Sequence, residues 1–299
     1  MRFSKNTYIQ FTFFIVVLIL FGILINNLTI NLLRTDLGFT FNWLSKPAGF
    51  EIAEHPLPFN PSSNYAWAIL IGWLNNIKVI ILSLVFSTFL GFLVGLARIN
   101  RNLILRYLSS FYITIIRQTP LLLQLMLWYF VAFLGLKDNL LINIENILQI
   151  SNQGIDIFNL NFSSEFSSLL IGLSIFTSAY IGEIFRGGIL SVPRGQWEAF
   201  RSLGISESKG LLTIIMPQAL PTIIPGLTSQ YLNLAKNSTL AIAVGYSDIY
   251  SINDTIINQT GRAIECFIIL MLSFLLLNLI ISNSMEIINK LIIKSRKNY

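Results

Sequence analysis

Charged residues are scarce in this chain. Only 11% of its 299 residues are Asp, Glu, Lys or Arg, whereas 54% are hydrophobic. Soluble domains carry about 25% charged residues, so this composition excludes an ordinary soluble domain. Several apolar runs also reach the length of about 20 residues that a helix needs to cross the hydrocarbon core of a bilayer. The sequence therefore predicts an all-α protein that crosses a membrane several times.

Cysteine and histidine are equally rare, with one residue of each. Cys266 lies inside an apolar run and cannot form an internal disulfide, so a small buried side chain is the favoured interpretation. His55 lies in a proline-rich stretch without a second His or a Cys nearby, which favours a solvated loop residue over a metal ligand. A membrane-embedded enzyme would need a constellation of such residues. We therefore expect no catalytic residue, no metal and no cofactor in this chain.

The apolar runs predict about six transmembrane helices. The first, Tyr8 to Asn26, is too long for the apolar region of a signal peptide and lacks a small-residue cleavage pattern. Residues 27–64 contain scattered charge and four prolines, which predicts an external loop. The other spans are expected at about Ile69 to Ala97, Tyr112 to Leu134, Ser167 to Ile189, Leu211 to Leu234 and Ile264 to Ile288.

Prolines interrupt two of these expected spans. Pro120 lies in the third, and Pro217, Pro221 and Pro225 lie in the fifth, so we expect both helices to be kinked or broken. The pattern divides the chain into an N-terminal helix with its external loop (1–64), a transmembrane domain (65–290) and a basic tail (291–299).

The net charge of +6 would fit a nucleic-acid partner, but the positions of the basic residues favour a different explanation. With both termini in the cytoplasm, basic residues concentrate in the cytoplasmic segments, as the positive-inside rule requires. We therefore expect no nucleic-acid partner. The cytoplasmic residues are Arg2, Lys5, Arg98, Arg101, Arg106, Arg194, Arg201, Lys209, Lys290, Lys294, Arg296 and Lys297, against Arg34, Lys46 and Lys137 in external loops.

The loop between the fourth and fifth spans, residues 192–217, has the pattern of two short helices. The first is expected from Gln196 to Leu203, because Gly204 suits the left-handed position that follows a helix. Ser206 with Glu207 suits the start of the second.

The first of these short helices is predicted to be amphipathic. Trp197, Phe200 and Leu203 recur every three residues and would form one apolar face beside a Glu198–Arg201 pair. Such a helix fits a groove on a soluble partner. Its shape alone fits the headgroup level of the membrane equally well.

The same loop resembles the EAA loop of the permease subunits of bacterial ABC importers. Glu198-Ala199-Phe200, Gly204, Ile214 and Met216-Pro217 stand at the spacings of that motif, with Phe200 and Met216 as apolar departures from it. The resemblance implies that the loop is a coupling helix seated on an ATPase subunit. The residues implied in coupling are Gln196, Trp197, Glu198, Ala199, Phe200, Arg201, Gly204 and Pro217.

Further segments between residues 38 and 285 resemble the polar amino-acid branch of these permeases. Arg117–Gln124, Ala179–Gly188 and Lys236–Leu240 carry this resemblance, and Phe41–Phe50 narrows it to the general L-amino-acid permeases of Gram-negative bacteria. The chain is shorter between its third and fourth spans than the longer members. The resemblance implies the fold of a type I importer permease, with five core helices plus an N-terminal helix, in the bacterial inner membrane.

The implied partners are a second permease subunit, identical or paralogous, a cytoplasmic ATPase dimer and a periplasmic amino-acid-binding protein. The chain contains no phosphate loop of the form Gly-x-x-x-x-Gly-Lys-Ser/Thr. ATP with Mg²⁺ would therefore bind to a partner subunit. A secondary transporter driven by an ion gradient is the alternative, but it leaves the amphipathic loop without a purpose.

Polar residues within the spans are candidates for the substrate path, because a zwitterionic amino acid needs both hydrogen-bond donors and acceptors. Structural roles compete with this interpretation. Glu183 and Arg186 can neutralise each other at i,i+3, and Arg117 and Lys236 can extend to opposite membrane surfaces. The candidates are Arg117, Gln118, Thr119, Gln124, Glu183, Asn233, Lys236 and Asn237.

Overall fold

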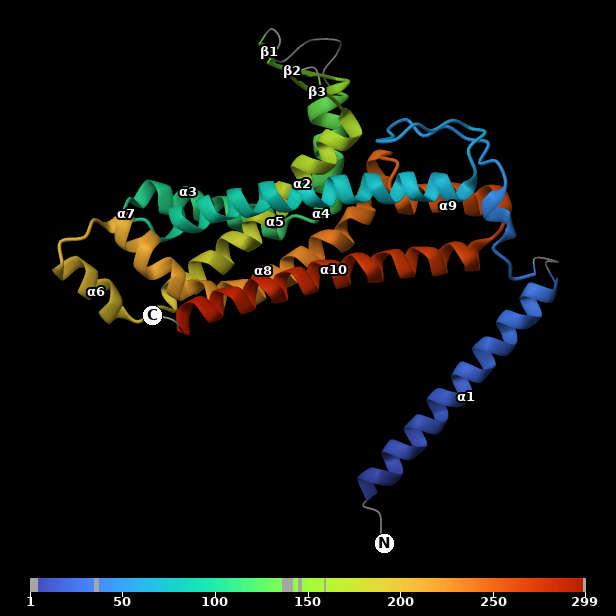
Figure 1. The fold of residues 1–299 in the computed structure, drawn as a ribbon, viewed down its shortest axis with the longest axis horizontal. Helices are drawn as coiled ribbons and strands as arrows, with labels where there is room; N and C mark the ends of the chain where they lie inside the picture. Colours follow the sequence, from blue (N-terminus) through green and yellow to red (C-terminus); the bar gives the residue numbers. More distant parts are fainter. Residues whose placement is uncertain (1–4, 35–37, 136–141, 145–146, 159, 298–299) are drawn as a thin grey trace.

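The computed structural model describes residues 5–34, 38–135, 142–144, 147–158 and 160–297. Arg2 and Lys137, which enter the topology argument above, lie outside these ranges. Within them the protein is a bundle of long helices with one small sheet (Figure 1). Five helices have the length and composition of membrane spans, or six if one bent pair counts as a span. The expectation of about six spans in a mostly helical protein is confirmed.

The long helices of the bundle lie side by side. Figure 1 shows α2, α8 and α10 along its long axis, with α6 (Arg194–Ser202) and α7 (Glu207–Gly210) at one end and α9 (Ile249–Thr260) at the other. The bundle consists of α2 (Tyr65–Ile99), α3 (Leu103–Gln118), α5 (Ser164–Leu190), α8 (Met216–Asn237) and α10 (Ala263–Lys297).

Helices α2 and α5 pack closely because small residues line their contact. A Cβ atom added at Gly91 would lie 2.5 Å from the Cγ2 atom of Ile181, and one at Gly95 would lie 2.7 Å from the Cβ atom of Phe185. Small residues of this kind let helix backbones approach each other where lipid offers no hydrophobic drive for association. The pair α2–α5 therefore forms the closely packed centre of the bundle.

The third span bends sharply at Pro120, as predicted. The helix formed by α4 (Leu121–Met126) and η2 (Leu127–Phe133) leaves α3 at an angle of 104°. Proline has no N–H to donate to the carbonyl of Ile116. The Gln124 side-chain amide donates to that carbonyl at 2.9 Å and to the Thr119 carbonyl at 3.0 Å. Gln124 therefore stabilises the bend.

The start of the third span was predicted wrongly. Helix α3 begins at Leu103 rather than Tyr112, so only residues 100–102 separate it from α2. Asn102 caps the helix, because its side-chain oxygen accepts a hydrogen bond from the Ile104 N–H at 2.9 Å. Arg106 is therefore part of the helix and not of a loop.

The expected break of the fifth span at its inner prolines is also absent. Helix α8 is continuous through Pro221 and Pro225. Pro217 lies in the first turn, where no intrahelical N–H bond is required. Within the expected fifth span, the irregular backbone is the π-helical turn η3 (Leu211–Ile215), which joins α7 to α8.

A four-stranded antiparallel sheet between η2 and α5 was not expected. Its strands are β1 (Ile142–Ile144), β2 (Leu148–Ser151), β3 (Gly154–Ile157) and β4 (Leu160–Ser163), paired in that order. Ile150, Ile155 and Phe162 lie opposite one another across the strands, as do Leu148, Ile157 and Leu160. The alternation of side chains places this apolar set on one face and polar residues such as Gln149, Asp156 and Asn161 on the other.

Glu54 ties the long first loop to this end of the bundle. Its carboxylate accepts a hydrogen bond from the Ser163 N–H at 3.3 Å and pairs with Lys78 on α2 at 3.5 Å. Its backbone carbonyl accepts from the Asn75 side chain at 2.8 Å. The loop, which includes the short helix η1 (Asn42–Ser45), is therefore a packed cap on α2 and the sheet.

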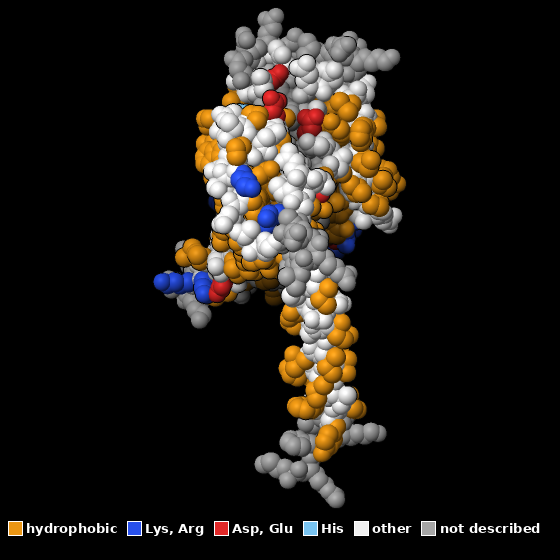
Figure 2. Space-filling view, turned by 90° about the vertical axis from the view of Figure 1, so that its right-hand side faces the viewer, with side chains coloured by type: hydrophobic (Ala, Val, Ile, Leu, Met, Phe, Trp, Pro, Cys, Tyr) orange, Lys and Arg blue, Asp and Glu red, His pale blue; other side chains and the backbone are white. Residues whose placement is uncertain are grey.

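The N-terminal helix α1 (Lys5–Arg34) extends further than the expected span and stands apart from the bundle (Figure 1). Its most apolar window is not buried at all. Figure 2 shows hydrophobic side chains along its whole visible length. At the other end of the chain, α10 continues through Lys297 and includes most of the basic segment 291–299.

Candidate functional site

The loop between α5 and α8 folds into the two helices that its sequence predicts. Helix α6 begins after Pro193 and ends before Gly204, whose φ of +72° is the left-handed conformation expected there. Helix α7 begins after Ser206, with Glu207 in its first turn. A Cβ atom at Gly204 would meet nothing within 4 Å, so only its backbone conformation demands glycine.

Phe200 anchors α6 to the bundle. Its side chain is 1% exposed and packs among Ile189, Val192 and Ile215. A Cβ atom at Gly210 would lie 2.4 Å from the Phe200 ring, so a glycine is needed where α7 passes beneath it. Trp197 joins this cluster as a partly buried neighbour, with its ring centroid 5.9 Å from that of Phe200.

The prediction of a single apolar face was wrong for Leu203. Its side chain is 77% exposed, because α6 ends at Ser202 and Leu203 falls on the turn that leads to Gly204. Glu198 and Ala199 are also exposed. Helix α6 therefore presents an unburied surface of mixed chemistry on the side away from Phe200.

The predicted Glu198–Arg201 pair is also wrong. Arg201 instead pairs with Glu207 at the start of α7, with 2.8 Å between Nε and Oε1. The same carboxylate oxygen accepts from Arg101, just after α2, at 2.7 Å. Arg201 also lies 5.6 Å from the ring centroid of Trp197. One carboxylate thus links α2, α6 and α7, and Glu198 makes no ion pair with any described residue.

Two other coupling candidates lie at the junction with α8. The Gln196 side-chain oxygen accepts a hydrogen bond from Gln218 at 3.1 Å, which joins α6 to the first turn of α8. Pro217 stands in that same turn. The residues implied in coupling are therefore brought together at one end of the molecule.

The polar candidates from the spans gather around Tyr180 on α5. One pocket is lined by Arg98, Thr114, Arg117, Gln118, Glu183 and Tyr180. A second is lined by Gln230, Asn233, Lys236, Asn237 and Tyr180. Tyr180 lines both, so the two pockets meet at its side chain. Six of the eight substrate-path candidates line these pockets, namely Arg117, Gln118, Glu183, Asn233, Lys236 and Asn237.

Glu183 forms the ion pair with Arg186 that its spacing predicts, and a second ion pair with Arg98. Its carboxylate pairs with Arg186 at 2.8 Å and with Arg98 at 2.9 Å. Arg98 also donates to Ser110 on α3. Three helices are thus linked through one carboxylate, at the wall of the first pocket.

Arg117 and Lys236 stand in the last turns of α3 and α8, and their extension to opposite membrane surfaces stays a prediction. Arg117 follows fourteen residues of α3, which places it about 21 Å along the span at 1.5 Å per residue. Its guanidinium lies 4.8 Å from the centroid of the Tyr180 ring. Lys236 lines the second pocket, to which Tyr180 also contributes. Both cations therefore line the pair of pockets that share Tyr180, which we call the Tyr180 cleft.

Thr119 and Gln124 line neither pocket. The Thr119 hydroxyl donates to the Ile115 carbonyl at 2.9 Å, and Gln124 serves the bend at Pro120. The polar lining residues that the sequence did not predict are Arg98, Thr114, Thr177, Tyr180 and Gln230. Arg98 had been assigned to topology alone, and a tyrosine inside an apolar span carries no distinguishing signal.

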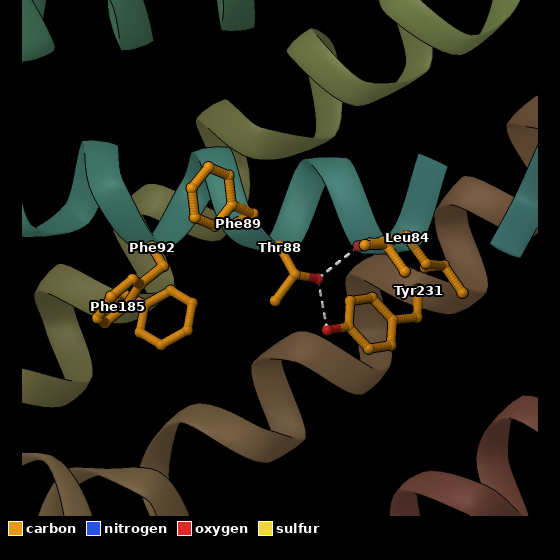
Figure 3. Close-up of a pocket in the computed structure, with 7 residues that line it drawn as sticks. Leu84, Thr88, Phe89, Phe92, Phe185 and Tyr231 are labelled. Atoms are coloured by element: carbon orange, nitrogen blue, oxygen red, sulfur yellow. Dashed lines mark hydrogen bonds between the residues drawn. The ribbon is translucent and has the colours of Figure 1, made fainter. Parts of the chain in front are cut away.

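A third pocket, shown in Figure 3, has a different chemistry. Its cavity of about 490 Å³ lies between α2, α5 and α8 and is lined mainly by Leu84, Phe89, Phe92 and Phe185. Its polar atoms are the hydroxyls of Thr88 and Tyr231, which hydrogen bond to each other at 2.7 Å. A pocket without charge does not suit a zwitterion, so the Tyr180 cleft is the better candidate for a polar solute.

The family emerges from comparison with known proteins. Residues 87–294 match the family described as the inner-membrane component of binding-protein-dependent transport systems. The chain belongs to this family. The matched region includes the α6–α7 loop and both Tyr180 pockets, and it confirms the resemblance to the permeases of amino-acid ABC importers.

Individual relatives agree with this assignment. A putative amino-acid ABC transporter permease of Escherichia coli, YhdX, is 33% identical over 90% of this chain and 89% of its own length. The general L-amino acid transport system permease AapQ of Rhizobium johnstonii is 32% identical over 88% and 86%. A solved structure of an amino acid ABC transporter with histidines superposes with a TM-score of 0.60, at 27% identity over 76% of this chain and 94% of that one.

Proposed function

We propose that this chain is the transmembrane subunit of an ATP-driven importer of amino acids, which forms the translocation path with a second permease subunit. A cytoplasmic ATPase dimer holds ATP and Mg²⁺, and a periplasmic binding protein delivers the amino acid. Two relatives carry amino-acid transport in their names, and both align over most of this chain. This protein is a transport subunit that relies on its partner for ATP hydrolysis.

The observation that carries the proposal is the way α6 is held. Phe200 is buried in the bundle, while Glu198, Ala199 and Leu203 remain exposed on or beside the same short helix. Because α6 is anchored on one side and free on the other, a soluble partner that moves α6 also moves α5 and α8. These two helices precede and follow the α6–α7 loop in the chain. An exposed leucine beside a charged residue also suits the groove of such a partner.

The orientation follows from this role. The ATPase is cytoplasmic, so the α6–α7 end faces the cytoplasm, and the sheet with α9 faces the periplasm. The end of α10 then lies on the cytoplasmic side (Figure 1), and α1, a single candidate span that leads into the periplasmic first loop, begins on that side as well. The distribution of lysine and arginine supports the same orientation. Motion of the two permease subunits against each other would open the Tyr180 cleft alternately to the two sides.

The Tyr180 cleft is the proposed substrate path. Arg117, Lys236 and Asn233 are exposed in the isolated chain, although they belong to helices apolar enough to be membrane spans. Polar groups at this depth require water or protein around them rather than lipid. A water-filled interface with the second permease subunit meets that requirement. The ion-gradient alternative is not favoured, because it gives the anchored helix α6 no role.

Gly204 offers a matched test of coupling. The complex with its ATPase is reconstituted in proteoliposomes, and amino-acid uptake and ATP hydrolysis are measured together. Gly204→Val forces a β-branched residue into the left-handed region, whereas Gly204→Asn keeps a residue that tolerates it. The Cβ atom of either residue would lie more than 4 Å from every described residue apart from its two chain neighbours, so a steric clash at this atom does not distinguish the two variants. We expect Gly204→Val to lower uptake per ATP hydrolysed at least about tenfold, and Gly204→Asn to change it little.

Equal uptake per ATP in the valine variant, the asparagine variant and the parent would contradict the coupling role. Uptake by this chain without any ATPase present would contradict the proposed function as a whole.

A further inference from the structure

The charges of the Tyr180 cleft are strongly unbalanced. Its two pockets are lined by the cations Arg98, Arg117 and Lys236 and by one carboxylate, Glu183. Arg186 contributes a further cation through its contact with Glu183. Among the described residues, no other acidic side chain lines either pocket.

The single carboxylate is already neutralised. Glu183 accepts from both Arg98 and Arg186 at less than 3 Å, and its side chain is only 20% exposed. Neither Arg117 nor Lys236 makes an ion pair with a described residue. Arg117 rests against the ring of Tyr180, a contact that leaves its charge uncompensated. The two pockets that share Tyr180 therefore hold two cations without an ion-pair partner among the described residues.

Two cations without an anionic partner on a solute path attract an anionic group of the solute. The α-carboxylate of an amino acid supplies one negative charge and neutralises one of them. A second negative charge on the substrate would neutralise the other. A second positive charge on the substrate would be repelled by Arg117, Lys236 and Arg98 together.

We propose that this cleft selects acidic amino acids, with one carboxylate of the substrate on Arg117 and the other on Lys236. The amide oxygens of Asn233 and Asn237, which line the Lys236 pocket, accept hydrogen bonds from the substrate's ammonium group. Glutamate and aspartate then neutralise both cations, and glutamine and asparagine neutralise one. Lysine and arginine add a further positive charge to the cleft. This inference rests on the proposed importer function and adds a substrate class to it.

The test compares two substrates of equal size that differ by one charge. Proteoliposomes contain the complete complex, the binding protein is supplied with the substrate, and initial uptake rates of L-glutamate and L-glutamine are measured. The binding protein is the same for every variant, so its own selectivity cancels when the glutamate-to-glutamine ratio is compared between variants. Arg117→Gln and Lys236→Gln remove one cation each. Lys290→Gln removes the same charge from an exposed pair with Glu286, remote from the cleft.

We expect the glutamate-to-glutamine ratio to fall roughly fivefold to tenfold in Arg117→Gln and in Lys236→Gln, the size of one partly exposed ion pair. The ratio should stay at the parental value in Lys290→Gln. Lys236→Arg, which keeps the charge, should retain most of the preference. An unchanged ratio in both cleft variants, with uptake intact, overturns the selectivity while leaving the importer function in place.

A second measurement covers variants that fail to assemble. Radiolabelled L-glutamate is bound to the parental complex in nanodiscs without the binding protein, and unlabelled L-aspartate, L-glutamine and L-lysine compete. Displacement in that order supports the proposal. Displacement by lysine at least as strong as by aspartate, or no glutamate binding, overturns it. A parental complex that takes up no amino acid at all contradicts the proposed function itself.

Discussion

The two ends of the bundle contrast in what holds them together. At the α6–α7 end, one buried aromatic ring and one carboxylate fasten a short amphipathic helix that is otherwise exposed. At the opposite end, the first loop, the sheet and α9 are joined through partly buried polar contacts, including those of Glu54, Asn75 and Asp248. In the proposed function, the ATPase partner moves the first end, and the second end is a fixed cap.

This contrast predicts that substitutions at the α6–α7 end change coupling, whereas substitutions at the sheet and α9 change local stability. The largest effect is expected from Phe200→Ala, because it removes a buried aromatic side chain. Such a truncation costs about 3–5 kcal/mol of stability. Uptake in proteoliposomes should fall sharply, and α6 should become accessible to limited proteolysis.

Phe130→Ala is the control for that substitution, because Phe130 lies in η2 and is 49% exposed. Loss of uptake to the same extent in both variants would show that any aromatic truncation disables the protein, and the special role of the Phe200 anchor would be wrong.

At the opposite end, Asp248 is expected to make stability depend on pH. The residue is 1% exposed, and burial raises the pKa of its carboxyl to about 7 although it accepts the Ser251 N–H at 2.8 Å. The folded protein therefore retains a proton that the unfolded chain, with a pKa near 3.8, has released. Stability is lost as the pH rises from about 4 to 7, and the loss is complete above the folded pKa.

Asp248→Asn keeps the shape and the capping oxygen but cannot ionise. We expect the thermal midpoint of the variant to rise relative to that of the parent between pH 4.5 and pH 7, by the equivalent of about 2–4 kcal/mol, and the difference to stay constant above pH 7. Thermal unfolding in detergent across this range measures it. If the difference in thermal midpoint does not change with pH, the Asp248 carboxyl is solvated, which would contradict its burial at this end of the bundle.

A smaller and local effect is expected from Gly154→Ala in the sheet. Gly154 has a φ of +129°, and an added Cβ atom would overlap the carbonyl oxygen of Phe162 on the neighbouring strand. Strain of this kind costs about 1–3 kcal/mol. Hydrogen exchange should become faster in β3 and β4, while uptake per ATP stays at the parental value. Uptake that fell as far as in Phe200→Ala would erase the distinction between the two ends.

The smallest effect is expected from Glu207→Gln. The ion pairs that it removes are exposed at the molecular surface, where each contributes less than about 1 kcal/mol. We expect a modest decrease in coupling that disappears at high salt, because salt screens the parental ion pairs as well. Uptake per ATP measured at two ionic strengths tests this, and a loss that persists at high salt would mean that Glu207 acts through something other than charge.

The α6–α7 end could be predicted from the sequence because its signals are local. Gly204 marks a helix end, and Trp197 and Phe200 mark one face of a helix. The partner of Arg201 could not be predicted, since the choice between Glu198 and Glu207 depends on how α7 folds back. The grouping of Arg117 and Lys236 was equally hidden, because it depends on the packing of α3, α5 and α8 around Tyr180.

The sheet did have a signal in the sequence, although it lies outside the long apolar runs. Apolar and polar residues alternate in Ile155-Asp156-Ile157 and in Leu160-Asn161-Phe162, the period of a strand. Helices η4 (Ser238–Val244) and α9 have no such strong pattern. They are defined by buried contacts with α2, as Ile249 and Ile252 show against Gly72.

The most direct test of the central claim is a cross-link from α6 to the ATPase subunit. Leu203→Cys places a thiol at a position that is 77% exposed, and the native Cys266 is buried, so only the new thiol should react. With a bifunctional thiol reagent and a cysteine in the ATPase groove, we predict a permease–ATPase adduct whose yield changes when ATP binds. If the introduced thiol is labelled from outside intact cells by a membrane-impermeant reagent and never cross-links to the ATPase, the coupling role of α6 is wrong.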